Sequence, residues 1–186
     1  MLAKALGRIE VGELGVVSFG GGGVATPLHP LERPFDDAAG AEVVSRLTFD
    51  QDNTIADKPV VELLHSLEAL LDQAAARVAP SDASLHQLVL ILADGRFHEK
   101  ESLQRAVREA SERRGTMMAF IALDSTLPGQ SLLDLKSVAF DEDGKPVLSK
   151  YMDAFPFPNY VLLRDITQLP NTFGDLLRQW FAMVSN

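Results

Sequence analysis

Residues 87–95 have the sequence QLVLILADG, and this stretch decides the fold class. The residues from Gln87 to Ala93 are almost continuously apolar, and Asp94–Gly95 end the run with a turn signal. A short run that is apolar at both alternating sets of positions is typical of a parallel strand covered by helices on both sides. The stretch therefore predicts a buried strand with Asp94 at its carboxyl end.

The rest of the chain alternates apolar runs with amphipathic stretches. Further strands are predicted at Leu14–Phe19 and Thr116–Leu123, and a last one begins at Tyr160–Leu163. Apolar residues at helical spacing predict helices at 60–78 before Pro80, at 103–110 before Gly115, at 173–184, and a short one at 40–47. This alternation predicts a doubly wound α/β fold, with a mainly parallel sheet and helices on both faces.

Two segments interrupt the alternation. Gly20–Pro34 contains four consecutive glycines and three prolines, and we expect a turn that leads into an edge strand or a loop. Ser125–Pro158 is too long for an ordinary connection and carries a turn signal at Asp143–Gly144. We therefore predict one domain over residues 1–186, with 125–158 as a long insertion on its surface.

The composition narrows the class of partner. The net charge is −9, from 26 acidic and 17 basic side chains, and this balance disfavours binding to nucleic acid or to an anionic membrane through a broad basic face. There is no cysteine, which excludes disulfides and thiolate metal sites. No apolar run has the length of a membrane span, so we expect an intracellular protein.

Asp94 and Thr54 are the residues best placed to carry chemistry. Asp94 ends a predicted strand, at the sheet edge where open α/β folds bind ligands, and Thr54 shortly precedes the helix predicted from Val60. Taken singly, Asp94 is explained by a plain turn and Thr54 by a capping hydroxyl. Taken together, a carboxylate and a hydroxyl at one sheet edge suit a hard divalent cation with oxygen ligands.

Longer motifs resemble a known family. They are LGVVSFG (14–20), LTFDQDNT (47–54), QLVLILADGRFHEKESL (87–103) and MDAFPFPNYVLLRDITQLPNTFGDLLRQWF (152–181). In order and spacing they resemble the von Willebrand factor A-type domain, with its metal-ion-dependent adhesion site, that stands at the C-terminus of the midasin family of ribosome-assembly AAA ATPases. The resemblance covers essentially the whole chain, and the Phe-Pro-Phe-Pro run with the following strand and helix is its most specific part.

The resemblance implies a protein-binding module and not an enzyme. It makes Thr54 and Asp94 metal ligands for a divalent cation, expected to be Mg²⁺ with Mn²⁺ or Ca²⁺ as alternatives, and Asn53, Arg96, Phe97 and His98 candidate partner contacts. The implied partners are ubiquitin-like domains of large-subunit assembly factors. An acidic residue of such a domain would complete the coordination of the metal ion, and the ATPase motor would then remove the assembly factors from pre-60S particles. The implied location is the nucleus, in nucleolus and nucleoplasm, without direct nucleic-acid or membrane binding.

One departure from the family is large. The family's first metal-binding element, Asp-x-Ser-x-Ser, follows a central strand, and neither is found in this chain. We expect the domain to be N-terminally incomplete here, because loss of a central strand would expose two rows of backbone hydrogen-bonding groups. Either the segment is supplied elsewhere or the metal site is incomplete, and the sequence leaves both possibilities open.

Other functions fit the sequence less well. Gly20–Gly23 lacks the Gly-Lys-Ser/Thr ending of a phosphate loop, and the residues from His98 to Ser102 do not form the His-Glu-x-x-His motif of zinc proteases. Two alternatives stay open: another A-type adhesion domain with a different acidic partner, and a hydrolase that uses Asp94. The hydrolase is the weaker one, because the sequence has no nucleophile motif.

Overall fold

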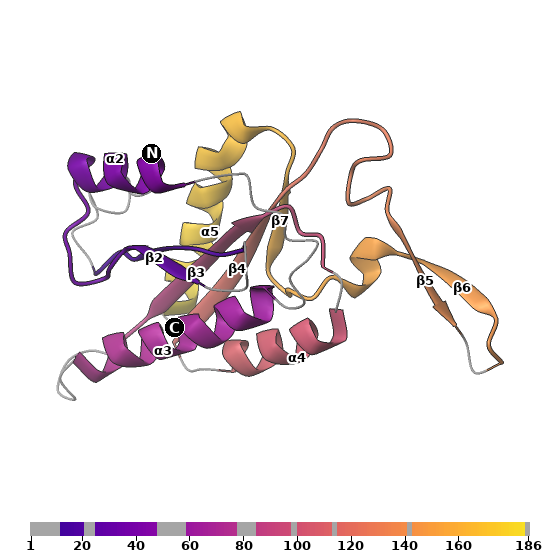
Figure 1. Cartoon of the computed structure of the whole chain (residues 1–186), viewed down its shortest axis with the longest axis horizontal. Coiled ribbons are helices and arrows are strands. Elements are labelled where there is room, and N and C mark those ends of the chain that lie inside the picture. Colours follow the sequence, from indigo (N-terminus) through magenta and orange to yellow (C-terminus); the bar gives the residue numbers. More distant parts are fainter. Residues whose placement is uncertain are drawn as a thin grey trace. The chain divides into compact units, whose positions relative to one another are not determined.

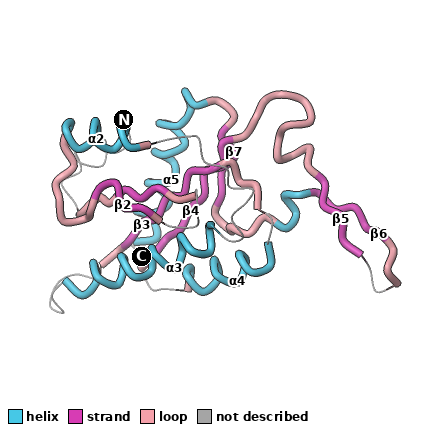
Figure 2. Tube along the Cα trace, in the orientation of Figure 1, coloured by secondary structure: helices cyan, strands magenta, loops and turns pink. Residues whose placement is uncertain are grey.

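The computed structural model describes residues 12–20, 25–47, 59–77, 85–97, 100–112, 115–140 and 143–184 (Figures 1 and 2). The chain divides into two compact units, Met1–Leu85 and His86–Asn186, and each is described by itself. The prediction of one domain over the whole chain stays a prediction. No helix within the described ranges has both the length and the apolarity to cross a membrane.

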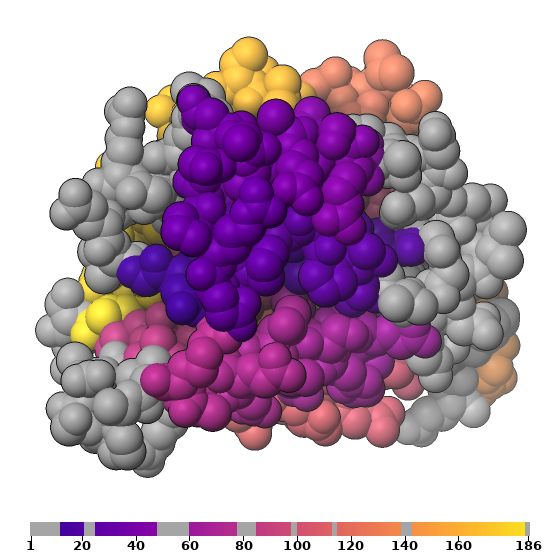
Figure 3. Space-filling model, turned by 60° about the vertical axis from the view of Figure 1, so that its left-hand side comes forward, coloured from indigo at the N-terminus to yellow at the C-terminus, as the bar shows by residue number. Residues whose placement is uncertain are grey.

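The first unit contains a hairpin and two helices. Strand β1 (Val16–Ser18) pairs antiparallel with β2 (Thr26–His29), and helices α2 (Asp37–Arg46) and α3 (Pro59–Arg77) follow. Asp36 caps α2 by accepting a hydrogen bond from the Ala39 amide at 2.7 Å. Figure 3 shows the described residues from β1 through α2 packed into one continuous surface.

Both helices and the edge strand β2 agree with the sequence prediction, but β1 differs from it. The strand predicted at Leu14–Phe19 is shorter, only half-buried and antiparallel to β2, so the expectation of a fully covered strand is wrong there. Gly20, which follows β1 closely, has a φ of 105°, in the left-handed region that favours glycine. The pairing with β2 makes β1 part of a local antiparallel hairpin, where apolarity alone indicated a covered strand.

The second unit is an α/β sandwich. Strands β3 (Gln87–Ala93), β4 (Thr116–Leu123) and β7 (Tyr160–Leu163) form a parallel sheet in the order β3-β4-β7, with helices α4 (Lys100–Ser111) and α5 (Leu169–Val184) beside it (Figure 1). These elements lie where the sequence predicted them, and the α/β class with a parallel sheet is confirmed. The finer assignment to the A-type family, with a central strand missing from the chain, stays a prediction.

Strand β4 forms the centre of this unit's core. Its residues from Thr116 to Ala122 are all buried, as expected for a strand with a partner on each edge and cover on both faces. One face packs into a cluster with α5, made by Met117, Ala119, Ile121, Leu163 and Leu176. The apolar stripe of α4 is also buried, and consists of Leu103, Ala106, Val107 and Ala110.

The segment 125–158 has more structure than the sequence indicated. It contains the hairpin of β5 (Lys136–Phe140) and β6 (Pro146–Lys150), with the predicted turn at Gly144, and the 3-10 helix η1 (Tyr151–Ala154). The assignment of 125–158 as an insertion within one domain stays a prediction. Its hairpin residues Val138 and Leu148 are 58% and 66% exposed, whereas Leu132, Tyr151 and Phe157 are 1%, 8% and 1% exposed. They are single buried residues without helix or strand periodicity, so no pattern in the sequence marked them.

Candidate functional site

Asp94 lies on a tight turn at the carboxyl end of β3. Its side chain is exposed, and its Oδ1 atom accepts a hydrogen bond from the Arg96 amide at 3.1 Å, which closes the turn. Gly95 is buried and has a φ of +73°, and a Cβ atom there would lie 3.0 Å from Leu132 Cδ1 and 3.3 Å from Ala122 Cβ. The turn therefore requires glycine after Asp94 both for its backbone conformation and for its packing.

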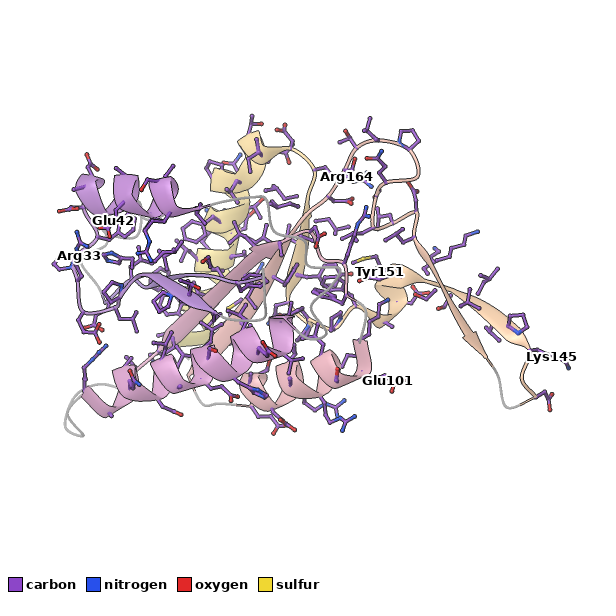
Figure 4. The ribbon with its side chains drawn as sticks, viewed as in Figure 1. Arg33, Glu42, Glu101, Lys145, Tyr151 and Arg164 are labelled. Atoms are coloured by element: carbon purple, nitrogen blue, oxygen red, sulfur yellow. The ribbon has the colours of Figure 1, made fainter. Side chains whose placement is uncertain are left out.

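A single hydroxyl group holds this turn from the other side. Tyr151 Oη accepts a hydrogen bond from the Phe97 amide at 2.7 Å and donates one to the Gly95 carbonyl at 2.9 Å. Figure 4 shows Tyr151 next to the carboxyl ends of the parallel strands, where η1 follows β6. Because both backbone groups bond the same buried oxygen, Tyr151 fixes the path of the turn that carries Asp94.

The surroundings of Tyr151 keep its hydroxyl protonated. Burial has the largest effect and raises the pKa of the phenol, and the Asp94 carboxylate also raises it. The hydrogen bond from the Phe97 amide and the charge of Arg96 lower the pKa, but not enough to offset burial. The Lys100 ammonium lies 3.3 Å from the centre of the Tyr151 ring and donates to the Tyr151 carbonyl at 2.9 Å. Burial lowers the pKa of Lys100. The first residue of α4 thus fixes the ring whose hydroxyl holds the turn.

Phe97 anchors the end of the turn in a group of aromatic rings. Its ring centroid lies 5.5 Å from that of Phe120, 5.6 Å from Phe155 and 6.0 Å from Phe157. Phe120 comes from the central strand, and Phe155 and Phe157 come from the Phe-Pro-Phe-Pro run. Edge and tilted contacts of this kind stabilise beyond plain burial. The run that carried the family resemblance therefore supports the Asp94 turn.

A second carboxylate, Asp124, lies at the end of the neighbouring strand. Its side chain is 1% exposed, and it accepts hydrogen bonds from Ser131 Oγ at 2.7 Å, the Leu132 amide at 2.8 Å and Arg164 Nε at 3.1 Å. Burial by itself would raise the pKa of Asp124, but these hydrogen bonds outweigh it and hold the pKa below its usual value. Because both of its carboxylate oxygens already accept hydrogen bonds, Asp124 holds the loop beside the Asp94 turn and is not a free ligand.

The structure brings together three of the six residues predicted for the site. Asp94, Arg96 and Phe97 share the turn, whereas Asn53, Thr54 and His98 lie outside the described residues. The predicted closeness of Asp94 and Thr54 therefore stays a prediction. Arg96 directs its guanidinium group to the Gln130 carbonyl at 2.9 Å. The ring of Phe97 is half-buried among other aromatic rings, so packing accounts for part of its role.

The metal expectation can be tested in part against this geometry. Asp94 fits the role of one oxygen ligand, because its carboxylate is exposed at the sheet edge and only one of its oxygens is used within the described residues. Within those same residues no group of three or more His, Cys, Asp or Glu side chains could hold a metal ion. Asp94 is therefore the one predicted ligand within the described residues, and the metal site stays a prediction.

Two features of the site were not predicted from the sequence. Tyr151 stands 56 residues from Gly95 in the chain, and no local pattern links the two. Asp124 follows β4 as Asp94 follows β3, so the signal that selected Asp94 would also have selected Asp124. Applied to both strands, it would have indicated two carboxylates on one edge, of which the structure shows one to be exposed and one to be buried.

No family model matches the chain. It aligns from end to end with midasin of Dictyostelium discoideum, at 32% identity over 187 residues, and with midasin of Giardia intestinalis, at 35% over 189 residues. The chain is similar along its whole length to a short stretch of midasin. It spans 3% of the Dictyostelium protein and 4% of the Giardia protein.

These alignments bear out the resemblance to the midasin family seen in the sequence, but not the specific adhesion domain within it. Among solved structures, the crystal structure of an uncharacterized membrane spanning protein from Vibrio fischeri aligns with 95% of this chain and 84% of its own, at 14% identity. Its TM-score of 0.27 is too low to carry an argument about the fold.

Proposed function

We propose that this chain is a protein-binding module of a ribosome-assembly ATPase, and that it binds its partner through a divalent cation at the Asp94 turn. The observation that carries the proposal is the exposed Asp94 carboxylate on a turn held by Tyr151 at the carboxyl end of a parallel strand. The end-to-end similarity to midasin supports the ribosome-assembly setting. The proposed location is accordingly the nucleus.

The chemistry of the proposed site follows from its ligands. Asp94 and Thr54 would offer oxygen atoms to the cation, and Mg²⁺ is expected, with Mn²⁺ or Ca²⁺ as alternatives. A cation held by few carboxylates keeps net positive charge and an open coordination position. A carboxylate of the partner fits that position, and we propose that it belongs to a ubiquitin-like domain of a large-subunit assembly factor on pre-60S particles.

The remaining predicted residues would surround this contact. Arg96 carries a positive charge next to Asp94, which favours an acidic partner, and its bond to the Gln130 carbonyl restricts the guanidinium group. Phe97 would contribute the exposed part of its ring, and Asn53 and His98 flank the ligand positions in the sequence. We propose binding rather than catalysis because the described hydrogen bond of Asp94 is with a backbone amide, not with a nucleophile or a base.

The experiment is calorimetry of a ubiquitin-like domain in Mg²⁺ buffer, with the chain preceded by the segment that carries the Asp-x-Ser-x-Ser motif. Asp94→Ala should weaken binding at least about tenfold without loss of the fold. Asp175→Ala is the matched control, because Asp175 is an exposed carboxylate on α5 whose described contact is an ion pair with Arg178. Equal affinities of the two variants would reject Asp94 as a binding residue.

A further inference from the structure

The chain contains two Asp-Gly pairs, Asp94–Gly95 and Asp143–Gly144. Both pairs have the same intrinsic reactivity, because glycine has no Cβ atom to keep its amide nitrogen away from the preceding side chain. The structure places the first pair at the carboxyl end of β3 and the second at the turn between β5 and β6. The two places differ in how firmly the carboxyl group and the next peptide are held.

The reaction in question is attack of the glycine amide nitrogen on the side-chain carboxyl carbon of the aspartate. A C–N bond forms, and the amide proton leaves with the hydroxyl of the protonated carboxyl group as one water molecule, which closes a succinimide ring. Water then opens the ring. Cleavage of the bond to the former backbone carbonyl gives isoaspartate, whereas cleavage of the bond to the side-chain carbon restores aspartate. The sequence of steps consumes no oxidant, reductant or cofactor.

The Asp143–Gly144 pair is open to this reaction. The Asp143 side chain is 78% exposed, and its carboxylate lies 3.7 Å from Lys145 Nζ in an ion pair between two exposed groups (Figure 4). An ion pair of this kind is weak and restrains the carboxyl group little. Gly144 has a φ of +75°, and a Cβ atom there would have nothing within 4 Å. The carboxyl group and the peptide that it must meet therefore both lie in open surroundings.

The Asp94–Gly95 pair is held on both sides. Asp94 Oδ1 accepts a hydrogen bond from the Arg96 amide at 3.1 Å, which restricts rotation of the carboxyl group. The Gly95 carbonyl accepts a hydrogen bond from Tyr151 Oη at 2.9 Å, and a Cβ atom at Gly95 would lie 3.0 Å from Leu132 Cδ1. The attack requires the carboxyl carbon to move over the next peptide, so it proceeds only after this turn has opened.

From this contrast we propose that Asp143–Gly144 is a site of isoaspartate formation, and that Tyr151 protects Asp94 from the same modification. In isoaspartate the chain runs through the side-chain carbon, which lengthens the backbone by one carbon atom and leaves the carboxylate on the former backbone carbon. That change at Asp94 would move the carboxylate from its position at the sheet edge. The inference goes beyond the proposed function, because it requires neither a metal ion nor a partner.

The test is incubation of the full chain at neutral pH and body temperature, followed by peptide mapping with electron-transfer fragmentation, which distinguishes isoaspartate from aspartate. Isoaspartate should accumulate at Asp143 at least about tenfold faster than at Asp94, because the Asp94 turn must first open. In concentrated urea the chain is unfolded, and the two rates should agree within about twofold. Absence of isoaspartate at Asp143, equal rates in the folded chain, or a tenfold difference that persists in urea would overturn the proposal.

Substitutions test the protective role of Tyr151 separately. Tyr151→Phe should raise the rate at Asp94 about fivefold, as expected for the loss of one hydrogen bond, and should leave the rate at Asp143 unchanged. Tyr160→Phe is the matched control and should change neither rate. Gly144→Ala should slow the reaction at Asp143, because the added Cβ atom hinders approach of the amide nitrogen. An unchanged rate at Asp94 in Tyr151→Phe, with the fold checked by circular dichroism, would refute the protection.

Discussion

Replacement of Tyr151 by phenylalanine tests whether its hydroxyl holds the Asp94 turn. The variant keeps the ring, and with it the contact to the Lys100 ammonium, but removes the oxygen that bonds the Phe97 amide and the Gly95 carbonyl. The Phe97 amide then loses its acceptor in a partly buried position, which costs about 1–3 kcal/mol, and the lost bond to the carbonyl adds about 1 kcal/mol. We expect the free energy of unfolding to fall by about 2–4 kcal/mol.

Urea unfolding measures this loss, and hydrogen exchange locates it. The urea concentration at the unfolding midpoint should fall, while the dependence of the unfolding free energy on urea stays unchanged. The Phe97 amide should exchange faster relative to amides in the middle of β4. The matched control is Tyr160→Phe, at the other of the two tyrosines in the chain. Tyr160 is 40% exposed, and its hydroxyl has no hydrogen bond within the described residues, so its loss should cost less than about 0.5 kcal/mol. Equal stabilities of the two variants would refute the role given to Tyr151.

Two other substitutions test the residues that support the Asp94 turn, Asp124 and Gly95. Asp124→Asn should lower the free energy of unfolding at neutral pH. Because the folded protein lowers the pKa of Asp124 from its usual 3.8, the ionised carboxylate stabilises the fold above that pH, and this stability is lost as the pH falls through the folded-state pKa. The difference in unfolding free energy between variant and parent should therefore shrink below pH 3.8. A pH-independent difference in acid unfolding curves would contradict this. Gly95→Ala should cost about 1–3 kcal/mol in thermal unfolding, and more than Gly129→Ala, since both have positive φ but Gly129 has nothing within 4 Å. Equal costs would mean that crowding at Gly95 has no effect.

The regular elements of the fold could be predicted because each has a local cause. Continuous apolarity marked β3 and β4 at their observed bounds, and helical spacing marked α3, α4 and α5 to within a few residues at their ends. The direction of β1 could not be predicted in this way. It depends on pairing with β2, and an apolar run does not encode its partner.

Asp94 could be selected from the sequence, but the contacts that hold its turn could not. Asp94 was selected because a carboxylate at the end of a buried strand lies at the ligand-binding edge, and the structure shows it exposed there. Tyr151, Ser131 and Arg164 were not selected, because their roles arise from contacts across long stretches of chain. Such contacts leave no periodic signal in the sequence.

Removal of the metal shows whether a metal ion connects this module to an acidic partner. Calorimetry would compare the affinity for a ubiquitin-like domain in Mg²⁺ and in EDTA, with the Asp-x-Ser-x-Ser segment present and the protein's fold checked in both buffers. We expect EDTA to abolish binding and added Mg²⁺ or Mn²⁺ to restore it. The chain without that segment should bind weakly or not at all. An unchanged affinity in EDTA would contradict the claim.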